Sequence, residues 1–131
     1  MSQTLSASEA AAAIRSSNLT SVDLVQRCIA RIEALEDTVR AWTFFDPAHA
    51  LHQAHEADRL HCANAPLGPL HGVPVGIKDI FDTSDMPTEN GTGHCHVWTP
   101  LADQGLFLAL RGSWVRSCLR PSFAENRIRW P

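Results

Sequence analysis

The sequence predicts an α/β fold in which N-terminal helices precede the first strands of a sheet. Helix-capping signatures occur at Ser6, Thr20 and Asp46, each followed by a segment of good helix formers. Two short runs, 41–45 and 73–81, are instead rich in aromatic and β-branched residues and are bounded by turn residues. Short strands that alternate with helices are typical of α/β proteins.

The first helix is predicted from Ser6 to about Ser16. Ser6 and Glu9 form the S-x-x-E pattern of a capping box, and small helix formers follow them. Asn18 is a candidate C-cap, because Asn tolerates the backbone conformation that ends many helices.

The second helix is predicted to start at Thr20. Thr20 would be its N-cap, and Asp23 lies in the first turn, where an acidic group interacts favourably with the helix dipole. Apolar residues then recur at steps of three and four and define a buried face: Val22, Val25, Cys28, Ile29, Ile32 and Leu35.

The segment Ala41–Phe45 is short and aromatic, which favours a strand. Asp46 and Pro47 then predict the N-cap and first position of a third helix, which we expect to run to about Leu60. Phe44 and Phe45 are expected in the core. Trp42 fits either the core or a binding surface.

The segment Gly68–Thr92 contains a lysine, Lys78, within an apolar run. The run predicts a short buried strand that includes Val73, Val75, Ile77, Ile80 and Phe81, and Pro74 belongs at its start or edge. Burial would favour a neutral amine that can accept a proton. The alternative is a lysine that reaches solvent or pairs with Asp79 or Asp82, and composition alone favours this alternative.

The stretch LHGVPVGIKDIFDTSDMPTENGT closely resembles the first conserved block of the amidase signature family. In that block P-L-x-G-[IV]-P-[VI]-x-[IV]-K-D precedes D-T-x-x-[ML]-x-T-x-x-G-[ST], and Lys78, Asp79, Thr88 and Gly91 occupy matching positions. The resemblance implies an α/β sandwich, with a mixed sheet flanked by helices. It also implies hydrolysis of a small-molecule amide by a Ser–cis-Ser–Lys triad, without a cofactor, in which Lys78 is the catalytic base. The order of elements is similar to the start of that fold over residues 5–93.

Both serines of the family's triad lie downstream of the lysine, in a block that resembles G-G-S-S-G-G-S. No such block occurs in this sequence, and after Gly93 the serines are Ser113, Ser117 and Ser122, without neighbouring glycines to form an oxyanion hole. Since the family's domain has several hundred residues, 131 residues correspond to its first quarter to third. We therefore expect a truncated domain that retains only Lys78 of the triad.

We divide the chain into residues 1–103, the N-terminal portion of an amidase signature domain, and residues 104–131, an aberrant tail. The tail interleaves arginines with tryptophans, cysteines and prolines, without a helix or strand period. It could contact nucleic acid through Arg and Trp, bind a protein partner irregularly, or be a disordered product of a shifted reading frame. We favour the third, because loss of pattern, loss of the motif and early termination coincide.

Composition is that of a soluble globular protein, with 44% hydrophobic residues, 19% charged residues and a net charge of −3. This balance does not call for nucleic acid or an anionic membrane. No apolar run of roughly eighteen residues and no basic leader followed by an apolar stretch is present, so we expect a cytoplasmic protein without a membrane span.

The cysteines are scattered and are expected to be free thiols: Cys28, Cys62, Cys95 and Cys118. The clusters His94-Cys95-His96 and His61-Cys62 lack the paired spacing of zinc ligands, so no metal is expected. The histidines at three-residue spacing on the predicted third helix are expected on its solvated face: His49, His52 and His55.

The function predicted is that of an N-terminal fragment of an amidase-type hydrolase, inactive by itself. The alternative is a non-catalytic interaction module with a basic tail. The sequence of the segment DIFDTSDMPTENGT is most similar to general bacterial amidases. Residues Gly68–Gly93 are expected to be marginally ordered, because strands that follow later in the family's fold would normally cover them.

Overall fold

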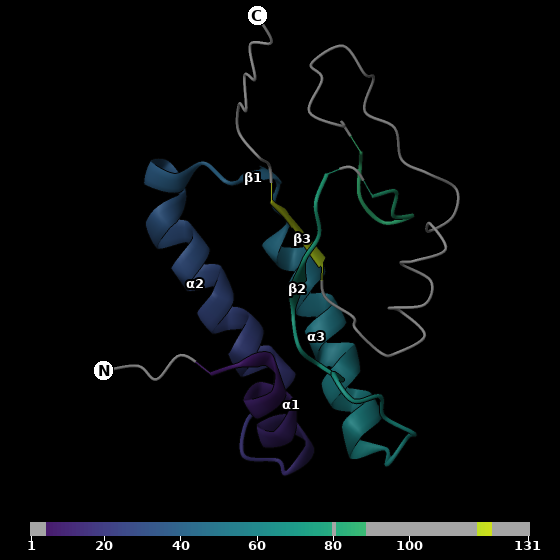
Figure 1. Ribbon diagram of the computed structural model, residues 1–131. Coiled ribbons are helices and arrows are strands. Elements are labelled where there is room, and N and C mark those ends of the chain that lie inside the picture. Colours follow the sequence, from purple (N-terminus) through teal and green to yellow (C-terminus); the bar gives the residue numbers. More distant parts are fainter. Residues whose placement is uncertain (1–4, 80, 89–117, 122–131) are drawn as a thin grey trace, which may run out of the picture.

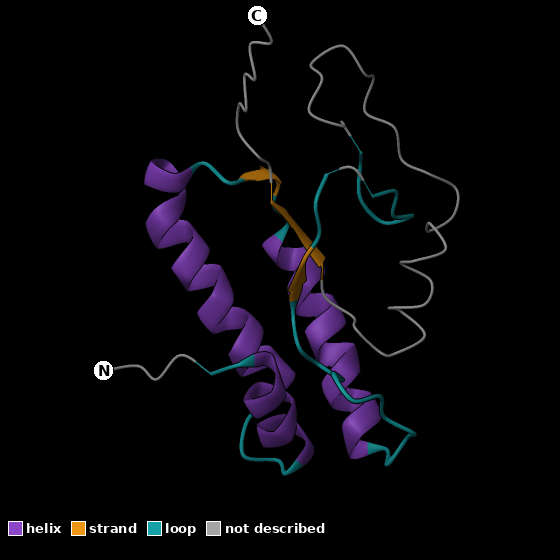
Figure 2. Ribbon diagram, viewed as in Figure 1, coloured by secondary structure: helices purple, strands orange, loops and turns teal. Residues whose placement is uncertain are grey.

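The computed structural model describes residues 5–79, 81–88 and 118–121. This part of the chain contains helices α1 (Ala7–Arg15), α2 (Ser21–Val39) and α3 (Pro47–Cys62). Its strands are β1 (Trp42–Phe44), β2 (Val75–Gly76) and β3 (Cys118–Pro121). Helix α2 lies alongside α3, and β3 pairs with both β1 and β2 (Figures 1 and 2). The predicted α/β class is confirmed.

Helix α1 begins as predicted. The Ser6 hydroxyl accepts from the Glu9 amide at 3.3 Å, and the Glu9 carboxylate accepts from the Ser6 amide at 2.7 Å, which completes the capping box. Its end differs from the prediction, because Ser16 is the C-cap and Ser17 has the left-handed φ of 59°. The Asn18 amide instead donates to the carbonyl of Ala13, so the turn closes through backbone bonds around Ser17.

Helix α2 is capped from two directions. The Thr20 hydroxyl accepts from the Asp23 amide at 3.0 Å, as its position in the sequence predicted. The Asp58 carboxylate of α3 accepts from the Ser21 amide at 2.7 Å and from the Val22 amide at 3.1 Å. First-turn amides have no partner within their own helix, so Asp58 satisfies two of them and joins α3 to the start of α2.

Helices α2 and α3 run antiparallel and pack through small residues (Figure 1). Ala50, Ala54 and Ala57 recur on one face of α3 and are at most 2% exposed. Val25 and Ile29 of α2 pack into the same cluster as Ala50 and Ala54. Alanines on this face let the two helices approach closely, and the apolar face predicted for α2 meets them except at Leu35, which is 39% exposed.

The connection between α2 and α3 follows the predicted pattern. Strand β1 occupies part of the aromatic run, and Asp46 caps α3 by accepting from the His49 amide at 2.9 Å, with Pro47 in the first turn. Trp42 and Phe45 are half-buried with ring centroids 6.3 Å apart, and both pack against the α2–α3 cluster. Trp42 therefore contributes to the core.

The predicted strand at 73–81 is shorter in the structure. Only Val75 and Gly76 form β2, directly after Pro74, whose missing N–H places it before the strand. The chain then turns, and the Phe81 amide donates to the carbonyl of Lys78 at 3.1 Å. This turn takes the residues after Ile77 out of the sheet.

Strand β3 lies within residues 104–131, where the sequence predicted no element. It is the central strand of the order β1-β3-β2, antiparallel to β1 and parallel to β2, so the sheet is mixed. Val75 lies opposite Cys118, and Gly76 lies opposite Leu119. Strand pairing uses backbone groups, which a search for side-chain periodicity does not detect.

Cys28 and Cys62 are free thiols in the structure, Cys28 half-buried and Cys62 exposed. Burial raises the pKa of the Cys28 thiol. Among the described residues, no helix is both long enough and apolar enough to cross a membrane.

Candidate functional site

The candidate site is centred on Lys78, which follows β2 directly. Ile77 is buried, Lys78 is exposed and Asp79 is buried, so successive side chains alternate between the core and the surface. The structure therefore agrees with the alternative of a lysine that reaches solvent and not with a buried amine. Lys78 is the only lysine of the chain.

A compact turn holds the backbone of Lys78. Its carbonyl accepts from the Phe81 amide at 3.1 Å, and the carbonyl of Phe81 accepts from the Thr88 hydroxyl at 3.5 Å. Thr83 and Met86 then form an antiparallel bridge, and both are almost fully buried. We call residues 78–88 the lysine turn.

An apolar cluster packs against the lysine turn. Ile77 and Met86 are buried against each other, and three half-buried residues pack around them: Phe44, Val75 and Phe81. The residue before Lys78 thus contacts a residue near the end of the turn. This contact holds the backbone of the turn in place, while the lysine side chain remains exposed.

The loop before β2 is pressed against the helices. Gly72 has φ +75°, and a Cβ on it would lie 2.0 Å from the Ser21 Oγ. His71 is buried, and its Nε2 lies 2.8 Å from the carbonyl of Ala57, to which it donates a hydrogen bond. Arg15 donates to the carbonyl of Pro69 at 3.1 Å. These contacts fix the position at which the chain enters β2.

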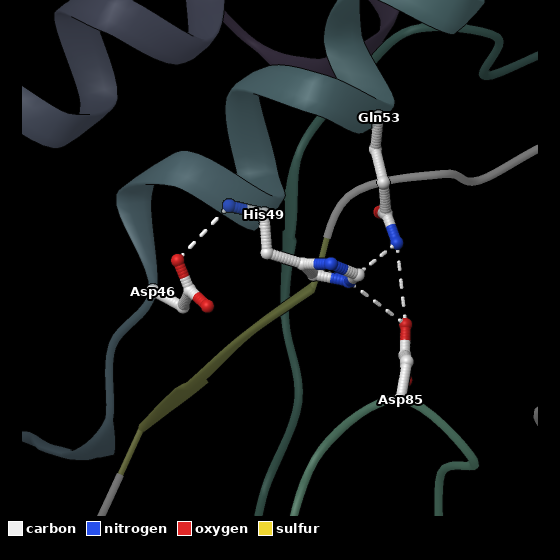
Figure 3. A network of polar contacts seen from close by, with 4 residues as sticks. All are labelled: Asp46, His49, Gln53 and Asp85. Atoms are coloured by element: carbon white, nitrogen blue, oxygen red, sulfur yellow. Dashed lines mark hydrogen bonds and ion pairs between the residues drawn. The ribbon is translucent and has the colours of Figure 1, made fainter.

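A polar network joins the lysine turn to α3 (Figure 3). Asp85 Oδ2 lies 3.2 Å from His49 Nε2 and 3.2 Å from Gln53 Nε2, and these two nitrogens are 2.8 Å apart. His49 therefore does not belong to the solvated face of α3 with His52 and His55, which are exposed. The i, i+4 spacing of His49 and Gln53 places them on one face of the helix, but the sequence had no signal for their contact with Asp85.

Several candidate residues lie outside the described part of the chain. These are the later serines and the histidine–cysteine cluster: Ser113, Ser117, Ser122 and His94-Cys95-His96. Of the other cluster, His61 Nε2 lies 3.4 Å from the Ser17 hydroxyl. Within residues 5–79, 81–88 and 118–121, no group of three or more histidine, cysteine or acidic side chains is arranged to hold a metal ion.

The fold and the lysine turn together define a class of protein. A sequence model of the amidase family matches residues 23–112, and this range includes the whole of the segment around Lys78. The chain belongs to the amidase signature family.

The comparisons with individual proteins agree with this assignment. A glutamyl-tRNA(Gln) amidotransferase subunit of Streptomyces coelicolor is 41% identical over 111 residues, which are 85% of this chain and 22% of that protein. The corresponding subunit of Chloroflexus aurantiacus is 40% identical over 88 residues, 67% of this chain and 18% of that protein.

Solved structures show the same relationship. A peptide amidase from Stenotrophomonas maltophilia has a TM-score of 0.76 and 28% identity, and the match covers 88% of this chain and 23% of that one. Another amidase structure, at 23% identity and a TM-score of 0.83, shows the shared fold alone. The chain thus spans about a fifth to a quarter of the length of the relatives it matches.

Proposed function

We propose that this chain supplies the N-terminal segment of an amide-hydrolysing amidase domain, with Lys78 as its catalytic base. The observation that carries the proposal is the lysine turn. The family motif over Gly68–Thr92 coincides with a structure in which buried residues hold the backbone while the Lys78 side chain is exposed. An exposed amine is accessible to catalytic groups on a segment that packs over the turn.

The chemistry follows from what such a triad requires. A serine is a weak nucleophile until a positioned base takes its proton. In the family's mechanism a neutral lysine accepts that proton through a bridging serine, the nucleophilic serine attacks the amide carbonyl, and water then hydrolyses the acyl-enzyme. Lys78 can perform only the first of these tasks.

These 131 residues contain no Gly/Ser-rich block, so we expect them to be inactive alone. Neither the covalent step nor the stabilisation of the oxyanion has a candidate group in the sequence. Purified protein incubated with glutamine or with a simple aliphatic amide should release no ammonia above the rate of a Lys78→Ala variant. Turnover that disappears in that variant would contradict the predicted inactivity.

The role of Lys78 is tested by restoring the missing groups. Residues 23–112 would replace the matching segment of the Streptomyces coelicolor protein, which supplies the remainder of the domain. In this graft we expect Lys78→Ala to lower turnover by about a hundredfold to ten-thousandfold, the usual contribution of a general base. Arg27→Ala, on the exposed side of α2, is the matched control for loss of a cation.

Equal activity of the Lys78→Ala and Arg27→Ala grafts would refute the catalytic role. The cytoplasmic location expected from the sequence stays a prediction. Tight, salt-sensitive binding of nucleic acid by the purified chain would instead support the interaction module.

A further inference from the structure

The contact between the lysine turn and α3 offers Asp85 Oδ2 two nitrogen donors, one from Gln53 and one from His49. Gln53 Nε2 carries two hydrogens, which it can donate to Asp85 Oδ2 at 3.2 Å and to a neutral His49 Nε2 at 2.8 Å. An Nε2–H on His49 would donate to Asp85 Oδ2 at 3.2 Å instead, and Gln53 would then have to rotate its NH2 group away from the 2.8 Å contact with that nitrogen. In both states the Asp85 carboxylate receives a hydrogen bond from α3.

Both α3 and the lysine turn place polar groups next to His49. Its own helix contributes the Asp46 carboxylate, which accepts from the His49 backbone amide, and the Gln53 amide. The lysine turn contributes Asp85, whose side chain is 16% exposed, against 30% for His49. A carboxylate this well covered loses most of its water, so hydrogen bonds from the helix matter more than they would at the surface.

The Asp85 contact is linked to Lys78 through Met86 and Ile77, which pack against each other. Asp85 precedes Met86, which is 1% exposed and packs against Ile77. Ile77 in turn precedes Lys78, whose carbonyl closes the turn by accepting from Phe81. Displacing Asp85 would shift Met86 and, through Ile77, the backbone that carries the lysine.

We propose that Asp85 is a positioning residue for Lys78, held on α3 by Gln53 and His49 so that the lysine turn keeps a fixed place relative to the helix. This inference rests on the proposed function, since it is Lys78 that makes the position matter. The relevant partners come from different elements, α3 and the turn, so the effect depends on tertiary contact (Figure 3).

Amide hydrogen exchange on the full chain tests the position without any assay of activity. The Phe81 amide reports closure of the turn, because it donates to Lys78, and amides of α2 report the remaining fold. We expect Asp85→Ala to accelerate exchange at Phe81 by at least about tenfold, with exchange in α2 unchanged. Asp85→Asn should recover part of the protection, since its amide oxygen still accepts from Gln53.

Gln53→Met provides a second variant that leaves the carboxylate in place, and it should give a smaller acceleration because an Nε2–H of His49 can still donate to Asp85. Asp37→Ala, an exposed carboxylate on α2, is the matched control and should change nothing. Unchanged Phe81 exchange in Asp85→Ala, or equal acceleration in α2 and at Phe81, would overturn the proposal.

The graft described above adds a kinetic readout. Asp85→Ala should lower kcat by about tenfold and leave KM within about twofold, because it displaces the base rather than the substrate. A raised KM with unchanged kcat would contradict the inference. A Lys78→Ala graft that stays active would refute the proposed function. The exchange result would still test independently whether Asp85 holds the lysine turn in place.

Discussion

At the scale of single residues, Gly72 is a tightly constrained position. It has φ +75°, and an added Cβ would lie 2.0 Å from the Ser21 Oγ and 3.1 Å from the Ser21 Cβ. A side chain there would be strained by its backbone conformation and would also collide with the first turn of α2. Glycine at this position lets the loop before β2 lie directly on the helix.

Gly72→Ala should therefore destabilise the fold by about 2–4 kcal/mol, the sum of overpacking and a left-handed alanine. Ser21→Ala should be neutral or slightly stabilising, because among the described residues the buried Ser21 hydroxyl has no hydrogen-bond partner. Chemical denaturation of both single variants and of the double variant measures these changes in the free energy of unfolding. The double variant should lose less than the sum of the two, and strict additivity would contradict a collision between these residues.

At the same scale, the sequence motif around Lys78 and its tertiary surroundings give different information about this residue. The order of residues around it resembles the amidase block, and this order identified the residue. Its exposure matches the alternative that composition alone favoured, although the apolar neighbours Ile77 and Phe81 suggested a buried strand. The turn that begins at its carbonyl ends the strand early.

At the scale of elements, α2 depends on a cap that comes from another helix. Asp58 of α3 accepts from two first-turn amides of α2. We expect Asp58→Ala to lower the free energy of unfolding by about 1–3 kcal/mol, since a charged acceptor is lost and two donors remain unsatisfied. Denaturant titration checks this, with Asp37→Ala as a surface control that should stay within about 0.5 kcal/mol of the wild type.

Helix α1 should respond to acid through its capping box. Hydrogen bonds from Ser6 hold the pKa of the Glu9 carboxyl below its ordinary value. A lowered pKa in the folded state means that the cap stabilises α1 above the ordinary carboxyl pKa and that this stabilisation is lost as pH falls through the folded value. NMR shifts of the Ser6 and Glu9 amides, followed from about pH 6 to pH 2, should report this loss.

Glu9→Gln is the control for that titration, because glutamine can complete the same capping box but does not ionise. Its amide shifts should stay flat over the acidic range. A titration of the Ser6 amide that persists in Glu9→Gln would show that another group is responsible.

The boundaries of the helices followed local rules. Ser6, Thr20 and Asp46 cap the three helices as predicted, since each hydroxyl or carboxylate needs only an amide two or three residues away. The helix ends were less predictable. Ser17, Arg40 and Asn64 adopt left-handed conformations without being glycine, and of these only Asn64 is a residue type that often does so.

At the scale of the whole molecule, stability is unevenly distributed. The α2–α3 interface contains fully buried Val25 and Ala50, whereas β2 has only two residues and depends on β3 for its pairing. Segments with few buried apolar contacts open more readily than a packed helix pair. The marginal order expected for Gly68–Gly93 stays a prediction.

We therefore predict that backbone amides open in two groups. Exchange at Phe81 should be measurably protected but faster than at Val25 by at least about tenfold at neutral pH. Hydrogen exchange followed by NMR or mass spectrometry distinguishes the two groups. Equal protection at both positions would show that the lysine turn and the helix pair unfold as one unit.

By itself, the sequence determined the helices, their caps, the family and the residue at the centre of the site. These features are encoded by neighbours in the chain or by an ordered motif, so they can be recognised without coordinates. Only the tertiary structure decided that β3 lies between β1 and β2, that Asp58 caps α2 and that Asp85 meets His49 and Gln53. Each of these depends on groups far apart in sequence that packing brings together, and no local periodicity records such a contact.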